Sequence, residues 1–89
     1  MQEFSLPIIN RLGLHARAAS RFVAESGRFA SRVRVRKDGD WVDGKSIMAV
    51  MMLAAGKGAV LEAQTEGEDE VAAREALVAL VNDYFGEGG

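Results

Sequence analysis

The chain has 89 residues, no cysteine, one histidine and a formal net charge of −2. These features exclude disulfides, thiolate metal sites and a multi-histidine metal cluster, and they suit a reducing compartment. No apolar run approaches the roughly 20 residues that span a bilayer, and the N-terminus lacks the basic and apolar stretches of a signal peptide. We therefore expect one domain over residues 1–89, in the cytoplasm, with no metal, no cofactor and no membrane insertion.

The charge is distributed unevenly along the chain. Residues 1–45 carry nine Lys or Arg and five Asp or Glu, whereas residues 46–89 carry two and eight. A basic half suits an acidic partner or a phosphate, and an acidic half opposes wrapping by nucleic acid. We therefore expect no nucleic-acid partner.

The first half of the chain predicts three strands and one helix. Alternating apolar residues over 4–8 predict a strand, and helical spacing over 16–26 predicts a helix that stops at a glycine. Two valines alternating with arginines over 32–36 predict a half-buried strand with a solvated basic face. The Asp-Gly pair at 38–39 predicts a tight hairpin turn into a strand at 41–42.

The second half predicts a short apolar helix over 46–53, a strand over 59–65 and a long helix over 69–85. Acidic residues at the start of the long helix favour its N-terminus. Its expected apolar stripe consists of Val71, Leu77, Val78, Leu80, Val81 and Phe85. The order βαββαβα predicts an α/β (α+β) two-layer domain with the helices on one side of the sheet.

The start of the first predicted helix has the features of an anion site. His15 precedes it, where Ser, Thr, Asp or Asn would be the usual cap, so we expect free backbone N–H groups at Ala16 and Arg17. The Arg17 guanidinium suits phosphate oxygens. Because neutral imidazole is nucleophilic near pH 7, a phosphoryl group on His15 would lie among these donors. A solvated surface histidine, a general anion site or a plain helix start would give a similar pattern.

The predicted helix after Ser46 has no polar face beyond that residue. We expect Val50 and Leu53 to face inward and Ile47, Met48 and Met51 to be at least partly exposed. An exposed apolar patch usually marks a partner surface, and flexible methionines suit several partners. The alternative is that these side chains pack under the neighbouring helices. The predicted docking residues are Ser20, Arg21, Lys45, Ile47, Met48 and Met51.

Two segments resemble the signature motifs of HPr, the histidine-containing phosphocarrier family of the bacterial phosphoenolpyruvate-dependent phosphotransferase system. They are GLHAR at 13–17, with Asn10 upstream, and GKSIM at 44–48. The resemblance covers essentially the whole chain and implies an open-faced sandwich of four antiparallel strands covered by three helices. It implies that enzyme I phosphorylates His15 on Nδ1 and that an enzyme IIA domain receives the phosphate. One departure is Ala18, where the family commonly has proline; alanine favours the helix but leaves its first turn freer to fray.

The residue pattern alone predicts that Ser46 is an ordinary helix N-cap. Its match to the regulatory serine of the family implies phosphorylation by an HPr kinase/phosphorylase where one exists. The helix N-terminus should tolerate that phosphate, whereas its negative charge should repel acidic partners. The resemblance therefore predicts a monomeric phosphoryl carrier that is not a turnover enzyme.

Three other functions stay open. A docking regulator of the same family could be switched at Ser46 without phosphotransfer for sugar transport, although regulatory relatives that have lost transfer lack the histidine. A nucleic-acid-binding module is disfavoured by the acidic second half. A small phosphatase is disfavoured because no second catalytic group stands out near His15.

Overall fold

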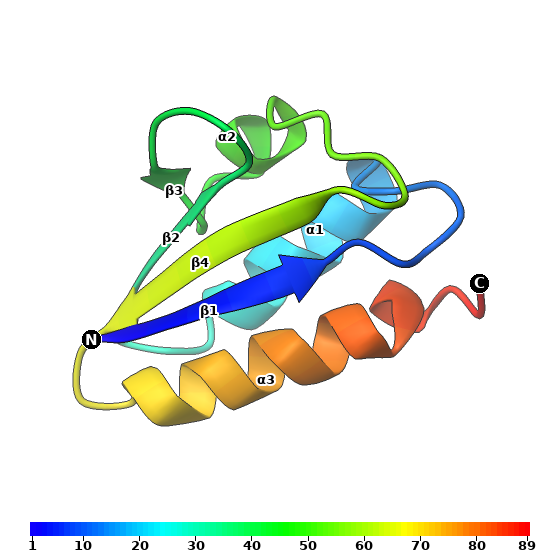
Figure 1. The fold of residues 1–89 in the computed structure, drawn as a ribbon. Coiled ribbons are helices and arrows are strands. Elements are labelled where there is room, and N and C mark those ends of the chain that lie inside the picture. The colour runs from blue at the N-terminus through cyan, green and yellow to red at the C-terminus, as the bar shows by residue number, and fades with distance from the viewer.

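The computed structural model describes residues 1–89, which form a four-stranded sheet, three helices and a terminal turn of 3₁₀ helix (Figure 1). The elements in chain order are β1 (Gln2–Pro7), α1 (Ala16–Ser26), β2 (Arg32–Arg36), β3 (Val42–Asp43), α2 (Ile47–Met51), β4 (Val60–Glu66), α3 (Glu70–Asn82) and η1 (Tyr84–Gly86). The strand order across the sheet is β1-β4-β2-β3, and every neighbouring pair is antiparallel. The predicted element order and fold class are confirmed. None of the helices is both long enough and apolar enough to cross a membrane.

Alternation along the strands separates a covered face of the sheet from an open one. Leu6 of β1 lies opposite Leu61 of β4, and Val35 of β2 lies opposite Ala63 of β4; all four are buried. Their neighbours along each strand are exposed or half-buried, and most of them are polar. The four buried residues belong to a core of 15 buried apolar residues, to which α1 contributes Phe22 and α3 contributes Leu77; α2, η1 and the loops supply further members. Burying each large apolar side chain contributes about 1.5–3 kcal/mol, so this face determines where the helices pack.

Two predicted elements in the middle of the chain differ in extent. Residues 36–41 separate the paired residues Val35 and Val42, so the connection is a wide loop and the predicted tight turn at 38–39 is wrong. The two-residue strand predicted at 41–42 lies one residue later, at Val42–Asp43, where it pairs with β2 at the edge of the sheet. Helix α2 ends at Met51, two residues before the predicted end.

The long C-terminal helix also ends earlier than predicted. Helix α3 stops at Asn82, and Phe85 has a φ of 53°, outside the helical range. Phe85 is nevertheless fully buried, because the chain bends after the helix and returns its ring to the core. Val71, which the predicted stripe included, is exposed, whereas Ala73 is buried.

Asp69 joins the start of α3 to the connection between α1 and β2. Its carboxylate accepts hydrogen bonds from the backbone N–H groups of Ala30 and Ser31, both at 2.9 Å, and from the Ser31 hydroxyl. These bonds lower the pKa of Asp69 below its usual value, with the Ser31 hydroxyl the largest contributor. The acid therefore holds two segments together and makes no side-chain cap for α3.

Candidate functional site

The loop before α1 is fixed against the loop after α2. Gly13 adopts a φ of +70°, and a Cβ at this position would lie 2.7 Å from the carbonyl oxygen of Ala55. The next residue, Leu14, is buried and its N–H donates to the same carbonyl at 2.8 Å. Only glycine adopts this backbone conformation in this space without strain. The loop therefore delivers His15 to the start of α1 in a defined position.

His15 is the N-cap of α1. Its backbone is extended, with φ −75° and ψ −179°, and its ring Nδ1 accepts a hydrogen bond from the Arg17 N–H at 3.3 Å. The prediction that this N–H has no side-chain acceptor is therefore wrong, because the histidine itself supplies one. The hydrogen bond that caps the helix therefore also points Nδ1 toward the free backbone N–H groups at the start of α1.

The residues around His15 differ in how exposed they are and in whether their side chains have partners. The His15 side chain is 29% exposed, and the Arg17 guanidinium forms neither a hydrogen bond nor an ion pair. Ala16 is exposed, so the backbone at the helix start is accessible. Ala18 is fully buried inside α1, where alanine favours the helix.

The C-terminal segment reaches His15 from the other side of the ring. The Glu87 carboxylate contacts His15 Nε2 at hydrogen-bond distance through one oxygen and accepts from Asn10 Nδ2 at 2.9 Å through the other. Burial raises the pKa of Glu87, but the hydrogen bonds from Asn10 and His15 and the charges of His15 and Arg17 outweigh it, so the net pKa lies below its usual value. Glu87 is therefore ionised near neutral pH.

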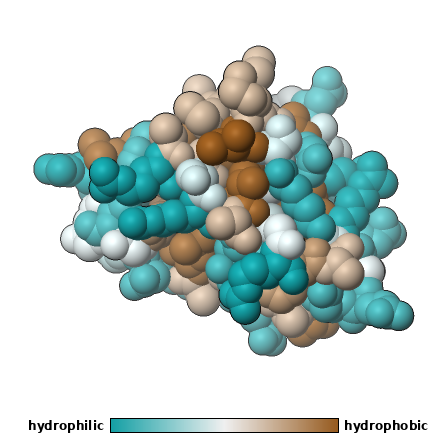
Figure 2. Space-filling view, turned by 180° about the vertical axis from the view of Figure 1, so that it is seen from behind, coloured by the Kyte–Doolittle hydropathy of each residue, from teal (hydrophilic) through white to brown (hydrophobic).

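The predicted docking residues of α2 form an apolar surface. Ile47, Met48 and Met51 are exposed, with Met48 at 66%, whereas Val50 is fully buried and Leu53 packs against the core. Figure 2 shows brown and tan side chains gathered from the upper edge to the centre of this face, where α2 lies at the top of Figure 1. The alternative, that these residues pack under the other helices, is wrong for the three exposed side chains.

The polar docking candidates occupy different places around α1. Ser20 and Arg21 lie exposed on α1, and the Arg21 guanidinium donates to the carbonyl oxygen of Phe85. Lys45 is half-buried, and its ammonium donates to the Phe29 carbonyl at 2.7 Å, beyond the C-terminal end of α1. Lys45 is therefore at the end of α1 remote from His15, and the structure does not bring the two together.

Ser46 is the N-cap of α2, as the residue pattern predicts. Its hydroxyl accepts from the Ala49 N–H at 3.3 Å, and it is half-buried. The residue stands next to the exposed Ile47 and Met48, so a change of charge at Ser46 would act at the edge of the apolar surface.

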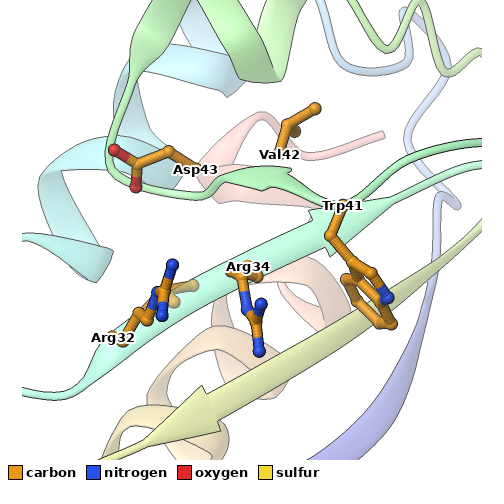
Figure 3. A pocket seen from close by; sticks show the side chains of 6 residues that line it. Arg32, Arg34, Trp41, Val42 and Asp43 are labelled. Carbon is orange, nitrogen blue, oxygen red and sulfur yellow. The ribbon is translucent and has the colours of Figure 1, made fainter.

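A hollow of about 340 Å³ lies on the open face of the sheet (Figure 3). Arg32 and Arg34 project to the same side of β2, whereas Val42 points away from them. Trp41 is stacked at 4.5 Å by the Arg36 guanidinium, which also bonds Glu62 at 3.1 Å. These contacts agree with the predicted solvated arginine face, and the hollow lies on the face opposite the helices.

A four-stranded open sandwich with a lone histidine as the N-cap of its first helix defines the class of small phosphoryl-carrier domains. Residues 2–83 match the family model described as "PTS HPr component phosphorylation site". The chain belongs to the HPr family, whose members are phosphocarriers of the phosphotransferase system and not turnover enzymes. Membership implies partners of that system, such as enzyme I and enzyme II.

Relatives and solved structures match over nearly their full length. The chain is 58% identical to the phosphocarrier protein HPr of Pseudomonas aeruginosa and 53% identical to that of Neisseria meningitidis, with 99% of each chain covered. A crystal structure of HPr from Thermoanaerobacter tengcongensis superposes with a TM-score of 0.93 at 44% identity, covering 98% of both chains.

Three features near the site were not predicted from the sequence. Glu87 is separated from His15 by 72 positions, and no local pattern connects them. Leu12 and Met52 are 61% and 79% exposed and add to the apolar surface near the site. Leu12 lies in the loop before α1 and Met52 is the C-cap of α2. Both lie outside the regular helical spacing that predicts which side chains are buried.

Proposed function

We propose that His15 carries the phosphoryl group, that the Arg17 guanidinium and the backbone of Ala16 and Arg17 bind its oxygens, and that Nδ1 is the accepting atom. The observation that supports this assignment most directly is the N-cap geometry. Nδ1 lies 3.3 Å from the Arg17 N–H, so a phosphoryl group on this nitrogen would meet the donors and the positive end of the helix dipole.

The same arrangement suits transfer in both directions. Phosphoryl transfer proceeds through a transition state whose charge is spread over the three equatorial oxygens, so catalysis depends on positioning and electrostatic stabilisation. The Arg17 side chain has no other partner, so binding phosphate would not break an existing ion pair. A half-exposed His15 remains open to a partner's active site on one side.

We infer that the exposed residues of α2, with Ser20 and Arg21, form the docking surface for enzyme I and for enzyme IIA domains. Lys45 belongs to the same surface at its far edge. The basic first half of the chain favours acidic partners, whose charge steers the encounter. We propose that the protein acts as a monomer in the cytoplasm, with no nucleic-acid partner.

We propose that Ser46 is a regulatory phosphorylation site for an HPr kinase/phosphorylase where one exists. Its hydroxyl caps only one N–H of a five-residue helix, and Asp is as good an N-cap as Ser. Ser46→Asp should therefore leave the free energy of unfolding within about 0.5 kcal/mol of wild type while slowing phosphorylation of His15. A large loss of stability would contradict this assignment.

The deciding experiment is intact-mass analysis after incubation with enzyme I, magnesium and phosphoenolpyruvate. Wild type should gain one acid-labile phosphate and His15→Ala none, with circular dichroism used to show that the variant is folded. A phosphate on His15→Ala would contradict the assignment, since the chain has no second histidine. If neither protein gains phosphate with a competent enzyme I, a docking regulator switched at Ser46 becomes the better function.

A further inference from the structure

The chain after α3 makes an unusual bend that is anchored at both sides. Tyr84 and Phe85 have φ values of 57° and 53°, a left-handed conformation that is unfavourable for residues with a Cβ. The fully buried Phe85 ring and the bond from the Arg21 guanidinium to the Phe85 carbonyl hold this conformation. The strained backbone is thus over-determined by its surroundings, as is common at functional sites.

The bend delivers Glu87 to a prepared position. The carboxyl side chain is only 8% exposed, and each oxygen has a different donor: Asn10 Nδ2 on one and His15 Nε2 on the other. Asn10 is fully buried, and its Nδ2 also donates to the Gly13 carbonyl at 2.7 Å. The acid is therefore fixed by the same loop that fixes the histidine.

This arrangement decides which ring nitrogen carries the proton. An ionised carboxylate only accepts hydrogen bonds, so His15 Nε2 must be the protonated nitrogen. The other nitrogen, Nδ1, then keeps its lone pair and accepts from the Arg17 N–H. A neighbouring group that bonds one ring nitrogen sets the role of the other.

We propose that Glu87 is a positioning residue for phosphoryl transfer, which holds the His15 proton on Nε2 and keeps Nδ1 free as the nucleophile. The proposal rests on the proposed function of His15. During uptake the Nδ1–P bond forms as the bond between phosphorus and the donor atom of enzyme I breaks. The proton stays on Nε2, so the ring becomes positively charged and the Glu87 carboxylate stabilises that charge. In delivery the Nδ1–P bond breaks as phosphorus bonds to the acceptor atom of the enzyme IIA domain, and the ring returns to its neutral form with the proton still on Nε2.

The test compares Glu87→Gln with wild type and with Asp83→Asn. Glutamine keeps the size but offers one acceptor oxygen for two donors, and its NH₂ can donate to Nε2. Asp83→Asn is the matched control, because it removes one exposed carboxylate from the same segment and Asp83 makes no side-chain hydrogen bond. Long-range ¹H–¹⁵N spectra give the tautomer of the neutral His15 ring, and steady-state assays with enzyme I give kcat and KM for each protein.

Wild type and Asp83→Asn should show the Nε2–H tautomer, whereas Glu87→Gln should gain the Nδ1–H form. The kcat for phosphorylation should fall about three- to tenfold in Glu87→Gln with KM unchanged, the net effect of one ordinary hydrogen bond, because glutamine still keeps one acceptor oxygen. A rise in KM alone would indicate a docking role and overturn the proposal. An unchanged tautomer in Glu87→Gln would also overturn the proposal. So would faster phosphorylation of this variant, which would show that Glu87 blocks the site. The tautomer is measured on the free protein without enzyme I. The role of Glu87 in setting the tautomer can therefore be tested even if His15 is not phosphorylated.

Discussion

Replacing Gly13 with alanine should disturb both stability and the site. Two costs can be estimated from the structure. A residue with a Cβ in the left-handed conformation, here φ +70°, costs about 1–2 kcal/mol. The Cβ would also lie 2.7 Å from the Ala55 oxygen and 2.8 Å from Gly56 Cα, both backbone atoms that cannot rotate away, and such overpacking costs about 1–3 kcal/mol.

The expected loss of unfolding free energy for Gly13→Ala is therefore about 2–5 kcal/mol. In a domain of this size each kcal/mol lowers the Tm by about 4–8 °C, so the Tm should fall by at least about 8 °C. The Asn10 amide donates to the Gly13 carbonyl, so a shift of this loop should also loosen the bond from Asn10 to Glu87. Phosphorylation of His15 should consequently slow under conditions in which the variant is folded.

Urea unfolding followed by circular dichroism measures the first effect, and the mass assay with enzyme I measures the second. The matched control is Gly39→Ala, because a Cβ at Gly39 meets nothing within 4 Å and its φ lies outside the left-handed range. That variant should be within about 1 kcal/mol of wild type. If Gly13→Ala is as stable as Gly39→Ala, the conclusion that the loop is held rigidly against Ala55 is refuted.

Three further predictions concern other parts of the fold. Leu77→Ala, in the buried face of α3, should lower the free energy of unfolding by about 2–5 kcal/mol, whereas Val71→Ala on its exposed face should change it by less than about 0.5 kcal/mol; equal losses in urea unfolding would refute the assigned faces. The pKa of Asp69 is lowered in the folded protein, chiefly by the hydrogen bond from the Ser31 hydroxyl. Ionised Asp69 therefore stabilises the fold at pH values above the pKa of the unfolded state, and this contribution is lost as the pH falls through the pKa of the folded state. The stability difference between wild type and Asp69→Asn should therefore shrink from about pH 7 to about pH 3, and a constant difference in urea midpoint would exclude this linkage. Met48→Asp should raise KM for enzyme I with little change in Tm, while the same change at Val71 should leave KM unaltered; an unaffected KM at Met48 would remove α2 from the docking surface.

Local sequence patterns determined most of the secondary structure. The alternation of valine with arginine over β2 and the helical spacing of α1 fix which side of each element is apolar, and burying that side determines the sheet with helices on one face. The glycine at 27 and the Ser46 cap marked element ends because their effects act within one turn. The motif at 13–17 identified the family and the histidine without any contact between distant residues.

Only the tertiary structure decided the second half of the site. The helical spacing of apolar residues predicted that α3 continues to Phe85, but the helix ends at Asn82. Burying the Phe85 ring in the core compensates for its left-handed backbone, which the spacing does not predict. The width of the loop at 36–41 depended on how β3 pairs at the sheet edge. Glu87 meets His15 because the bend after α3 crosses the start of α1, and contacts over 72 positions of sequence leave no local pattern. The sequence by itself pointed to His15 as the proposed phosphoryl acceptor, whereas only the tertiary structure placed the Glu87 carboxylate against its ring.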